Sequence, residues 1–180
     1  IIFIGIFGIS ISQDFLPDNG SVLNYTQIFF RWPQIVGSQE YQIRLDHSAG
    51  FQIYNSDKNS IIVSSLDWGT LYSWQICGLD LDGNNISCYS ENNLTTSSLP
   101  LNYPANVTVL ENDNLNYESG ITILDYESLN FSVALDNLGN PIWFANRGNF
   151  PGNRISVTEF APNGNFIGYG YGGYEFDLNS

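Results

Sequence analysis

Apolar and polar residues alternate along short runs over most of the chain, and turns rich in Gly, Asn and Asp separate the runs. An alternation with a period of two predicts β-strands, because successive side chains of a strand point to opposite faces. The chain has no sustained apolar stripe at the three- and four-residue spacing of an amphipathic helix. The pattern therefore predicts an all-β protein.

Residues 15–98 hold about seven of these runs, spaced roughly 8–12 residues apart. Strands at this spacing, with an early tryptophan such as Trp32, are typical of a two-sheet β-sandwich. In one run Tyr41, Ile43 and Leu45 fall on the same face, as a strand with one buried side requires. We therefore expect a β-sandwich over this stretch.

The same stretch contains Pro17-x-Asn19-Gly20, Trp32, Tyr41-x-Ile43, Leu66-x-Trp68-Gly69-Thr70-Leu71-Tyr72-x-Trp74 and Leu94-Thr95-Thr96. With these residues it resembles a fibronectin type III domain. The resemblance implies that Tyr72 is the corner tyrosine near the start of the sixth strand, with its hydroxyl bonded to nearby backbone. An unrelated sandwich with the same strand spacing is the alternative.

The two cysteines, Cys77 and Cys88, lie on the two arms of the last hairpin of this sandwich. If Asp82-Gly83 forms a two-residue type I′ turn, residues whose numbers sum to 165 face each other, and so do the cysteines. Their geometry then allows a disulfide, which the oxidising conditions met by an exported chain favour. Two free, buried thiols are the alternative.

The turn of this hairpin, Asp80–Asn85, has a composition that also suits calcium. It is much shorter than an EF-hand loop, which spreads its ligands over about twelve residues. Ordinary hairpin chemistry explains each residue of the turn, so we expect no metal there and no cofactor elsewhere.

Residues 121–180 repeat a simpler pattern, in which an alternating strand enters a turn ending in Gly-Asn and returns as an aromatic strand. The turns are Asn137–Asn140 and Pro162–Asn165, where Gly139 and Gly164 accept the positive φ that a side chain resists. Recurrent hairpins of this kind predict the first blade or blades of an incomplete β-propeller, with ordinary hairpins as the alternative. The proline-containing stretch 99–120 before them is expected to be a linker.

Several residues of this last part match a known family. They are Gly120-Ile121-Thr122-Ile123-Leu124, Ala134-Leu135-Asp136-Asn137-Leu138-Gly139-Asn140-Pro141-Ile142-Trp143, Ala161-Pro162-Asn163-Gly164-Asn165-Phe166 and Tyr174-Glu175-Phe176-Asp177. With them the chain resembles the start of the aryl-sulfate sulfotransferases. The resemblance implies an exported protein with a β-sandwich before a propeller. It also implies transfer of a sulfuryl group from a phenolic sulfate donor to a phenolic acceptor through a histidine nucleophile.

The chain departs from this family where the chemistry would lie. Its single histidine, His47, falls outside the family's catalytic motif and is expected at the surface. Residues 155–158, where relatives often show histidine, read Ile-Ser-Val-Thr. No catalytic residue is therefore carried over. A propeller also needs at least about four blades, so we expect an N-terminal fragment whose chemistry lies beyond Ser180.

Residues 1–13 open with an apolar run, IIFIGIFGISI. The run is shorter than the about 20 residues of a membrane span, so we expect no stable membrane span. It suits the core of a secretory signal peptide, or equally a first β-strand that is buried in its own subunit or donated to a neighbouring subunit. The first interpretation, with a disulfide, predicts a secreted, periplasmic or cell-surface protein; the second predicts self-assembly through this segment.

The chain is strongly acidic, with 5 Lys+Arg against 18 Asp+Glu and a net charge of −13. This charge excludes nucleic acid as an expected partner, because phosphate binding needs a basic surface. It also argues against docking on anionic lipid. The two arginines near the last hairpins, Arg147 and Arg154, are the candidates for meeting an anion.

Three functions are compatible with these patterns. The first is the sulfotransferase just described, and the second is a non-catalytic extracellular binding or assembly protein. The third is binding of a glycan through Trp68 or Trp74 of the sandwich. Trp74 lies in mid-strand and is expected in the core, whereas Trp68 lies near a turn and is the better candidate for exposure.

Overall fold

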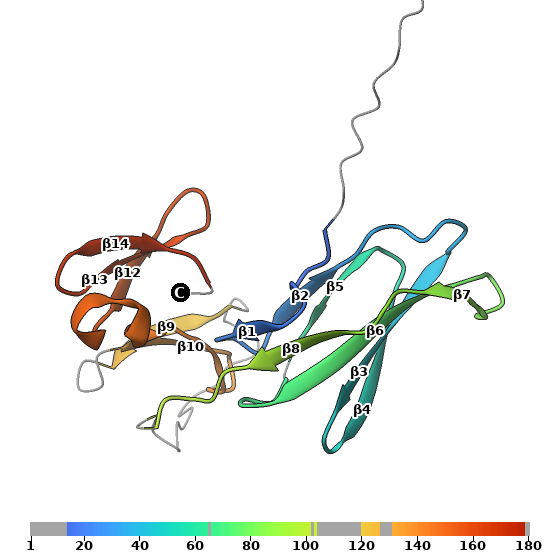
Figure 1. Cartoon of the computed structure of the whole chain (residues 1–180). Coiled ribbons are helices and arrows are strands. Elements are labelled where there is room, and N and C mark those ends of the chain that lie inside the picture. The colour runs from blue at the N-terminus through green and yellow to red at the C-terminus, as the bar shows by residue number, and fades with distance from the viewer. Residues whose placement is uncertain (1–13, 65, 102, 104–119, 127–130, 179–180) are drawn as a thin grey trace, which may run out of the picture.

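The computed structural model describes residues 14–64, 66–101, 103, 120–126 and 131–178. Over these residues the chain forms fourteen β-strands and two 3-10 helices of three residues each. The predicted all-β fold class is therefore confirmed. The strands form separate sheets, and the sandwich and the C-terminal sheets lie side by side (Figure 1). The apolar segment 1–13, for which we expect a signal peptide or a donated strand, lies outside the described residues.

The N-terminal part is a two-sheet sandwich. In the larger sheet β1 (Ser21–Leu23) pairs in parallel with β8 (Asn92–Thr96), whereas the other pairs are antiparallel. The smaller sheet is the antiparallel pair of β2 (Ile28–Arg31) and β5 (Ser60–Val63). The larger sheet has the order β1 (Ser21–Leu23), β8 (Asn92–Thr96), β6 (Leu71–Leu79), β3 (Glu40–His47) and β4 (Gly50–Ser56), with β7 (Asn85–Cys88) paired to β6.

The alternation seen in the sequence decides which faces meet in the sandwich core. Tyr41, Ile43 and Leu45 of β3 are buried, while the residues between them are half-buried or exposed. The early tryptophan Trp32 is fully buried and packs edge-on against Tyr41, with ring centroids 5.4 Å apart. Trp74 is buried too, as its position in mid-strand predicts. Burial of this continuous apolar face is what holds the two sheets together.

The hydroxyl of Tyr72 ties the start of β6 to the loop before it. Its side chain is fully buried, and its hydroxyl accepts a hydrogen bond of 2.9 Å from the backbone N–H of Asp67, five residues upstream. Burial raises the pKa of the Tyr72 phenol above its ordinary value, so the neutral form predominates well above neutral pH.

Replacing Tyr72 by phenylalanine keeps the ring and removes only this hydroxyl. We expect the free energy of unfolding to fall by about 1–3 kcal/mol, because the half-buried N–H of Asp67 loses its acceptor. Urea titration followed by tryptophan fluorescence measures the change. The matched control is Tyr54→Phe, because the exposed hydroxyl of Tyr54 donates to the side chain of Gln52. This change should lower the free energy of unfolding by less than about 0.5 kcal/mol. Equal effects of the two changes would contradict the corner role.

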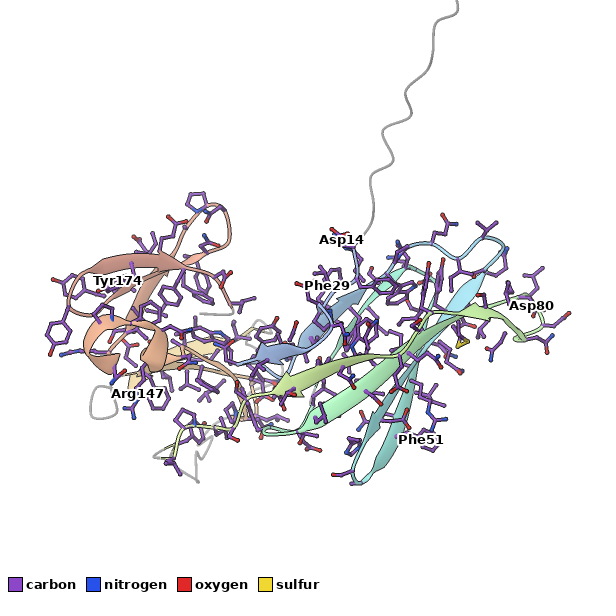
Figure 2. All side chains as sticks on the ribbon, in the orientation of Figure 1. Asp14, Phe29, Phe51, Asp80, Arg147 and Tyr174 are labelled. Atoms are coloured by element: carbon purple, nitrogen blue, oxygen red, sulfur yellow. A yellow bond between two sulfur atoms is a disulfide. The ribbon has the colours of Figure 1, made fainter. Side chains whose placement is uncertain are left out.

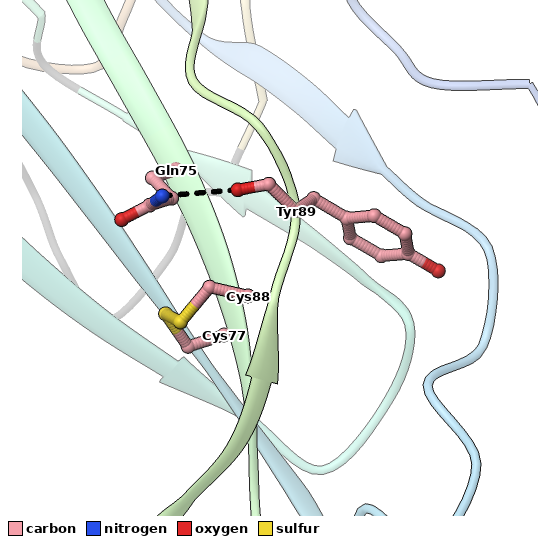
Figure 3. The surroundings of a disulfide bond; sticks show 4 residues. All are labelled: Gln75, Cys77, Cys88 and Tyr89. Atoms are coloured by element: carbon pink, nitrogen blue, oxygen red, sulfur yellow. Dashed lines mark hydrogen bonds between the residues drawn. A yellow bond between two sulfur atoms is a disulfide. The ribbon is translucent and has the colours of Figure 1, made fainter.

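The predicted disulfide between Cys77 and Cys88 is confirmed (Figure 3). The two residues are directly paired across β6 and β7, with a Cα–Cα distance of 4.0 Å. The neighbouring pair, Ile76 and Tyr89, carries the backbone hydrogen bond, so the cysteines occupy the more closely spaced, non-hydrogen-bonded position of the ladder. Nearby, the side chain of Gln75 donates to the carbonyl of Tyr89, which further ties the two arms together.

The predicted turn type of this hairpin is wrong, although the predicted pairing is right. The turn is a three-residue loop, residues 81–83, closed by the pair Asp80 and Asn84, and not a two-residue turn at Asp82-Gly83. A shift of register between Gly78 and Leu79 then restores the alignment of the cysteines. An extra residue in the turn and a β-bulge beside it therefore offset each other.

The C-terminal part consists of two three-stranded antiparallel meanders. Two 3-10 helices, η1 (Arg147–Asn149) and η2 (Pro151–Asn153), connect them. Between the sheets Trp143 stacks on Phe166 with ring centroids 4.5 Å apart. The first meander contains β9 (Thr122–Tyr126), β10 (Phe131–Leu135) and β11 (Pro141–Phe144), and the second contains β12 (Ser156–Phe160), β13 (Phe166–Tyr169) and β14 (Gly173–Phe176).

One turn geometry occurs three times in the described chain, at 80–84, 136–140 and 161–165. In each, the first N–H donates to the fifth carbonyl, and the N–H of the glycine at the fourth position donates to the first carbonyl. The glycines have φ of 79°, 82° and 88°, a region that side chains resist. This is a type I turn followed by a glycine bulge. The two Gly-Asn turns predicted in the C-terminal part thus share their geometry with the sandwich hairpin.

Candidate functional site

The connection between β1 and β2 belongs to both halves of the molecule. Its residues Asn24–Thr26 run antiparallel to β11, with Tyr25 paired to Trp143. The backbone N–H of Thr26 donates to the carbonyl of Ile142 at 2.9 Å, and the backbone N–H of Phe144 donates to the carbonyl of Asn24 at 3.1 Å. The segment therefore adds a fourth, short strand to the sheet β9–β10–β11. We call this region the junction.

Two side chains of the sandwich reinforce the junction. The amide of Asn24, which is buried, donates to the carbonyl of Phe144 at 2.6 Å. The indole N–H of Trp68 donates to the carbonyl of Pro141 at 3.2 Å, and its ring lies 5.4 Å from that of Phe144. Trp68 is therefore half-buried against the C-terminal sheet and less exposed than its place near a turn predicts.

A small apolar core lies beneath these contacts. It consists of Phe131, Val133, Leu135 and Phe144 of the first meander. Trp68, Leu99 and Tyr103 pack against it. The linker predicted at 99–120 thus begins with residues that pack on the first meander. Its residues 104–119 lie outside the described part of the chain. The junction joins the sandwich to the meander by apolar packing as well as by hydrogen bonds.

A groove of about 450 Å³ opens beside Trp68, between the sandwich and the turn 136–140. We call it the Trp68 groove. Its apolar wall includes Trp68, Leu66 and Ile142, and its polar rim includes Asp67, Asp136 and Asn140. Its volume lies within the range of small-molecule sites, which are mostly apolar with a few polar groups that orient the ligand.

The two carboxylates of the rim differ in their availability. Asp136 is engaged in its own turn, where it accepts the N–H groups of Leu138 and Asn140 and the side-chain amide of Asn140. The backbone N–H of Asp67 donates to the hydroxyl of Tyr72, and its backbone carbonyl accepts a hydrogen bond from the hydroxyl of Thr96. Within the described residues its carboxylate makes no hydrogen bond of its own. Asp67 is therefore the rim group best able to bind a ligand.

A second cavity, of about 290 Å³, lies between the end of the sandwich and the loop after β11. Its lining includes the aromatic rings of Phe131 and Phe144 together with Ser97, Asn146 and Arg147. Arg147 begins η1 on the loop that follows β11 (Figure 2). Arg154 is exposed, directly follows η2 as its C-cap and is not among the lining residues. The structure thus places one of the two predicted arginines at a cavity and does not bring them together there.

The remaining candidates from the sequence have structural roles. His47 ends β3, is half-buried and lies against Tyr72, with ring centroids 5.3 Å apart. Asp80 binds the N–H groups of Asp82 and Asn84 within its turn, and the hydrogen bond from the Asn84 backbone holds the pKa of Asp80 below its usual value. In the described part of the chain no cluster of His, Cys, Asp and Glu side chains is suited to hold a metal ion.

Sequence reasoning missed the role of Asn24 and the position of Asp67. Asn24 reads as an ordinary loop residue, and only its contact with Phe144, 120 residues away, reveals its function. Asp67 stands beside Trp68, so an aromatic residue next to a carboxylate was the one local signal for the groove.

None of the helices in the described stretches is long and apolar enough to cross a membrane. Neither a protein-family model nor a curated protein sequence matches the chain.

Proposed function

We propose that this chain is the supporting part of an exported protein that resembles the aryl-sulfate sulfotransferases. In this proposal a fibronectin type III-like sandwich braces the first blades of a β-propeller. The observation that carries the proposal is the strand Asn24–Thr26, which completes the sheet β9–β10–β11 from the sandwich side. Propeller blades are typically four-stranded, and this addition gives the first meander a fourth strand.

Further features support the two finer assignments. The meanders have the same turn geometry at 136–140 and 161–165 and face each other through Trp143 and Phe166, as neighbouring repeats of a propeller would. The corner at Tyr72 supports the fibronectin-like assignment of the sandwich. The disulfide is compatible with an extracellular protein.

Sulfuryl transfer in this proposal uses residues outside those described. The S–O(aryl) bond of the donor breaks, the sulfuryl group passes to the acceptor phenol oxygen, and the acceptor proton ends on the released phenol. A nucleophilic histidine would carry the group between the two phenols. His47 is not suited to this role, because its ring packs on Tyr72 within the sandwich.

The test is a transfer assay on the complete product of the reading frame that contains this chain, with 4-nitrophenyl sulfate as donor and phenol as acceptor. We expect release of 4-nitrophenol that depends on the acceptor, together with formation of phenyl sulfate. Residues 1–180 alone should show neither. The reaction without acceptor is the control for hydrolysis. Failure of the complete product to transfer to any phenol would contradict the enzymatic part of the proposal.

That negative result would favour the alternative, a non-catalytic extracellular binding or assembly protein. One observation supports the alternative. β4 ends the larger sheet among the described strands, and its residues Gly50–Ser56 carry no charge and no proline. Phe51 and Ile53 of this strand are exposed, and Figure 2 shows Phe51 on its outer side. Uncharged edge strands of this length are surfaces on which another strand can add.

A further inference from the structure

We propose that the Trp68 groove is a binding site for a neutral saccharide. The proposal rests on the shape and chemistry of the groove and is independent of the sulfuryl-transfer proposal. It gives glycan binding, one of the three functions compatible with the sequence, a defined site formed by both halves of the molecule.

The walls of the groove suit a ring with one apolar face. Trp68, Leu66 and Ile142 offer apolar surface, and the indole N–H of Trp68 is already bound to Pro141. The side chain of Trp68 therefore offers the groove its apolar ring surface. The C–H face of a pyranose packs on such a surface while its hydroxyls point to the sides. A volume of about 450 Å³ accommodates one or two sugar rings.

The rim suits hydroxyl groups as hydrogen-bond donors. Asp67 and Trp68 both line the groove, and the carboxylate of Asp67 accepts no hydrogen bond within the described residues. The side-chain NH₂ group of Asn140 donates to the carboxylate of Asp136. The side-chain oxygen of Asn140 accepts no hydrogen bond within the same residues. Both are acceptors, and a bond from a sugar hydroxyl to a carboxylate is of the stronger, charge-assisted kind.

The charge of the rim disfavours anionic ligands. Asp67 and Asp136 repel a sulfate, a phosphate or a carboxylate, and the chain as a whole carries −13. A quaternary ammonium ion prefers a cage of several aromatic rings, whereas among the described residues that line the groove Trp68 is the one aromatic residue. A neutral polyol with an apolar face fits both the apolar wall and the hydrogen-bond acceptors of the rim.

The experiment titrates the ¹⁵N-labelled chain with maltose, cellobiose and lactose at millimolar concentration and follows the indole N–H signals by NMR. We expect at least one disaccharide to shift the signal of Trp68, which lines the groove. The signal of Trp74 should stay in place, because Trp74 is buried in the sandwich core. The Asp67→Asn variant should bind about tenfold more weakly, since it loses a charged acceptor but none of the backbone bonds.

Asp57→Asn is the matched control, because Asp57 is also an exposed aspartate but lies in the turn between β4 and β5. It should bind the disaccharide as the unmodified chain does. The proposal is overturned if none of the three sugars shifts Trp68, or if Asp67→Asn and Asp57→Asn bind equally well. It is also overturned if choline or a sulfated disaccharide shifts Trp68 more strongly than the neutral sugars do. None of these outcomes depends on transfer activity, so this proposal and the proposed function fail separately.

Discussion

Replacing Trp143 by alanine is expected to lower the stability of the two C-terminal sheets by about 3–5 kcal/mol, the cost of truncating a large buried aromatic residue. Trp143 is buried, stacks on Phe166 and donates its indole N–H to the carbonyl of Leu178 at 2.9 Å. It is also the residue of β11 that faces Tyr25 at the junction. Its loss leaves a cavity between the sheets and weakens the junction at the same time.

The measurement is urea unfolding followed by amide NMR signals, which report on each half of the chain separately. Signals from β10 and β13 should disappear at lower urea than in the unmodified chain, while those of β3 and β6 persist. Leu138→Ala is the control in the same region, since Leu138 is exposed on its turn. It should lower the free energy of unfolding by less than about 0.5 kcal/mol. Unchanged unfolding of the Trp143 variant would show that the stacked pair contributes little.

Removing the disulfide by the double change Cys77→Ser and Cys88→Ser is expected to lower the free energy of unfolding of the sandwich by about 3 kcal/mol. The bond closes a loop with a sequence separation of 11, and its loss returns conformational entropy to the unfolded chain. β7 should be affected most, because every residue of it is exposed and the described strand that it pairs with is β6.

The midpoint of urea unfolding, measured with and without a reducing agent, checks this expectation. Reduction should lower the midpoint of the unmodified chain towards that of the serine pair. The serine pair itself should not respond to the reducing agent, and this makes it the control for other effects of reduction. A midpoint of the unmodified chain that is the same in both conditions would contradict the stabilising role.

The sequence predicts well those features that depend on neighbouring residues. The period of two places Tyr41, Ile43 and Leu45 in the core, where the structure has them. The pairing of Cys77 with Cys88 follows from a short hairpin, even though the turn is longer than predicted. In both cases the chain needs only local backbone geometry to define the outcome.

The junction could not be predicted in this way. Asn24 and Phe144 are 120 residues apart, and nothing in the pattern of either neighbourhood indicates the other. For the same reason the half-buried position of Trp68 differs from the exposure expected near a turn, because its neighbours Pro141 and Phe144 come from another sheet. The groove depends on this long-range packing, so its lining is apparent only in the folded chain.

The shared strand at Asn24–Thr26 has a consequence for the order in which the molecule is assembled during synthesis. The sandwich leaves the ribosome first, and domains that emerge first generally fold first. Within the folded sandwich the segment is already held in place, because Leu66 donates its N–H to Thr26 and Ser97 donates its N–H to Leu23. When β11 is synthesised, it therefore meets an edge that is already formed. The sandwich then acts as an intramolecular template, which fixes the position of the first later sheet before the second one exists.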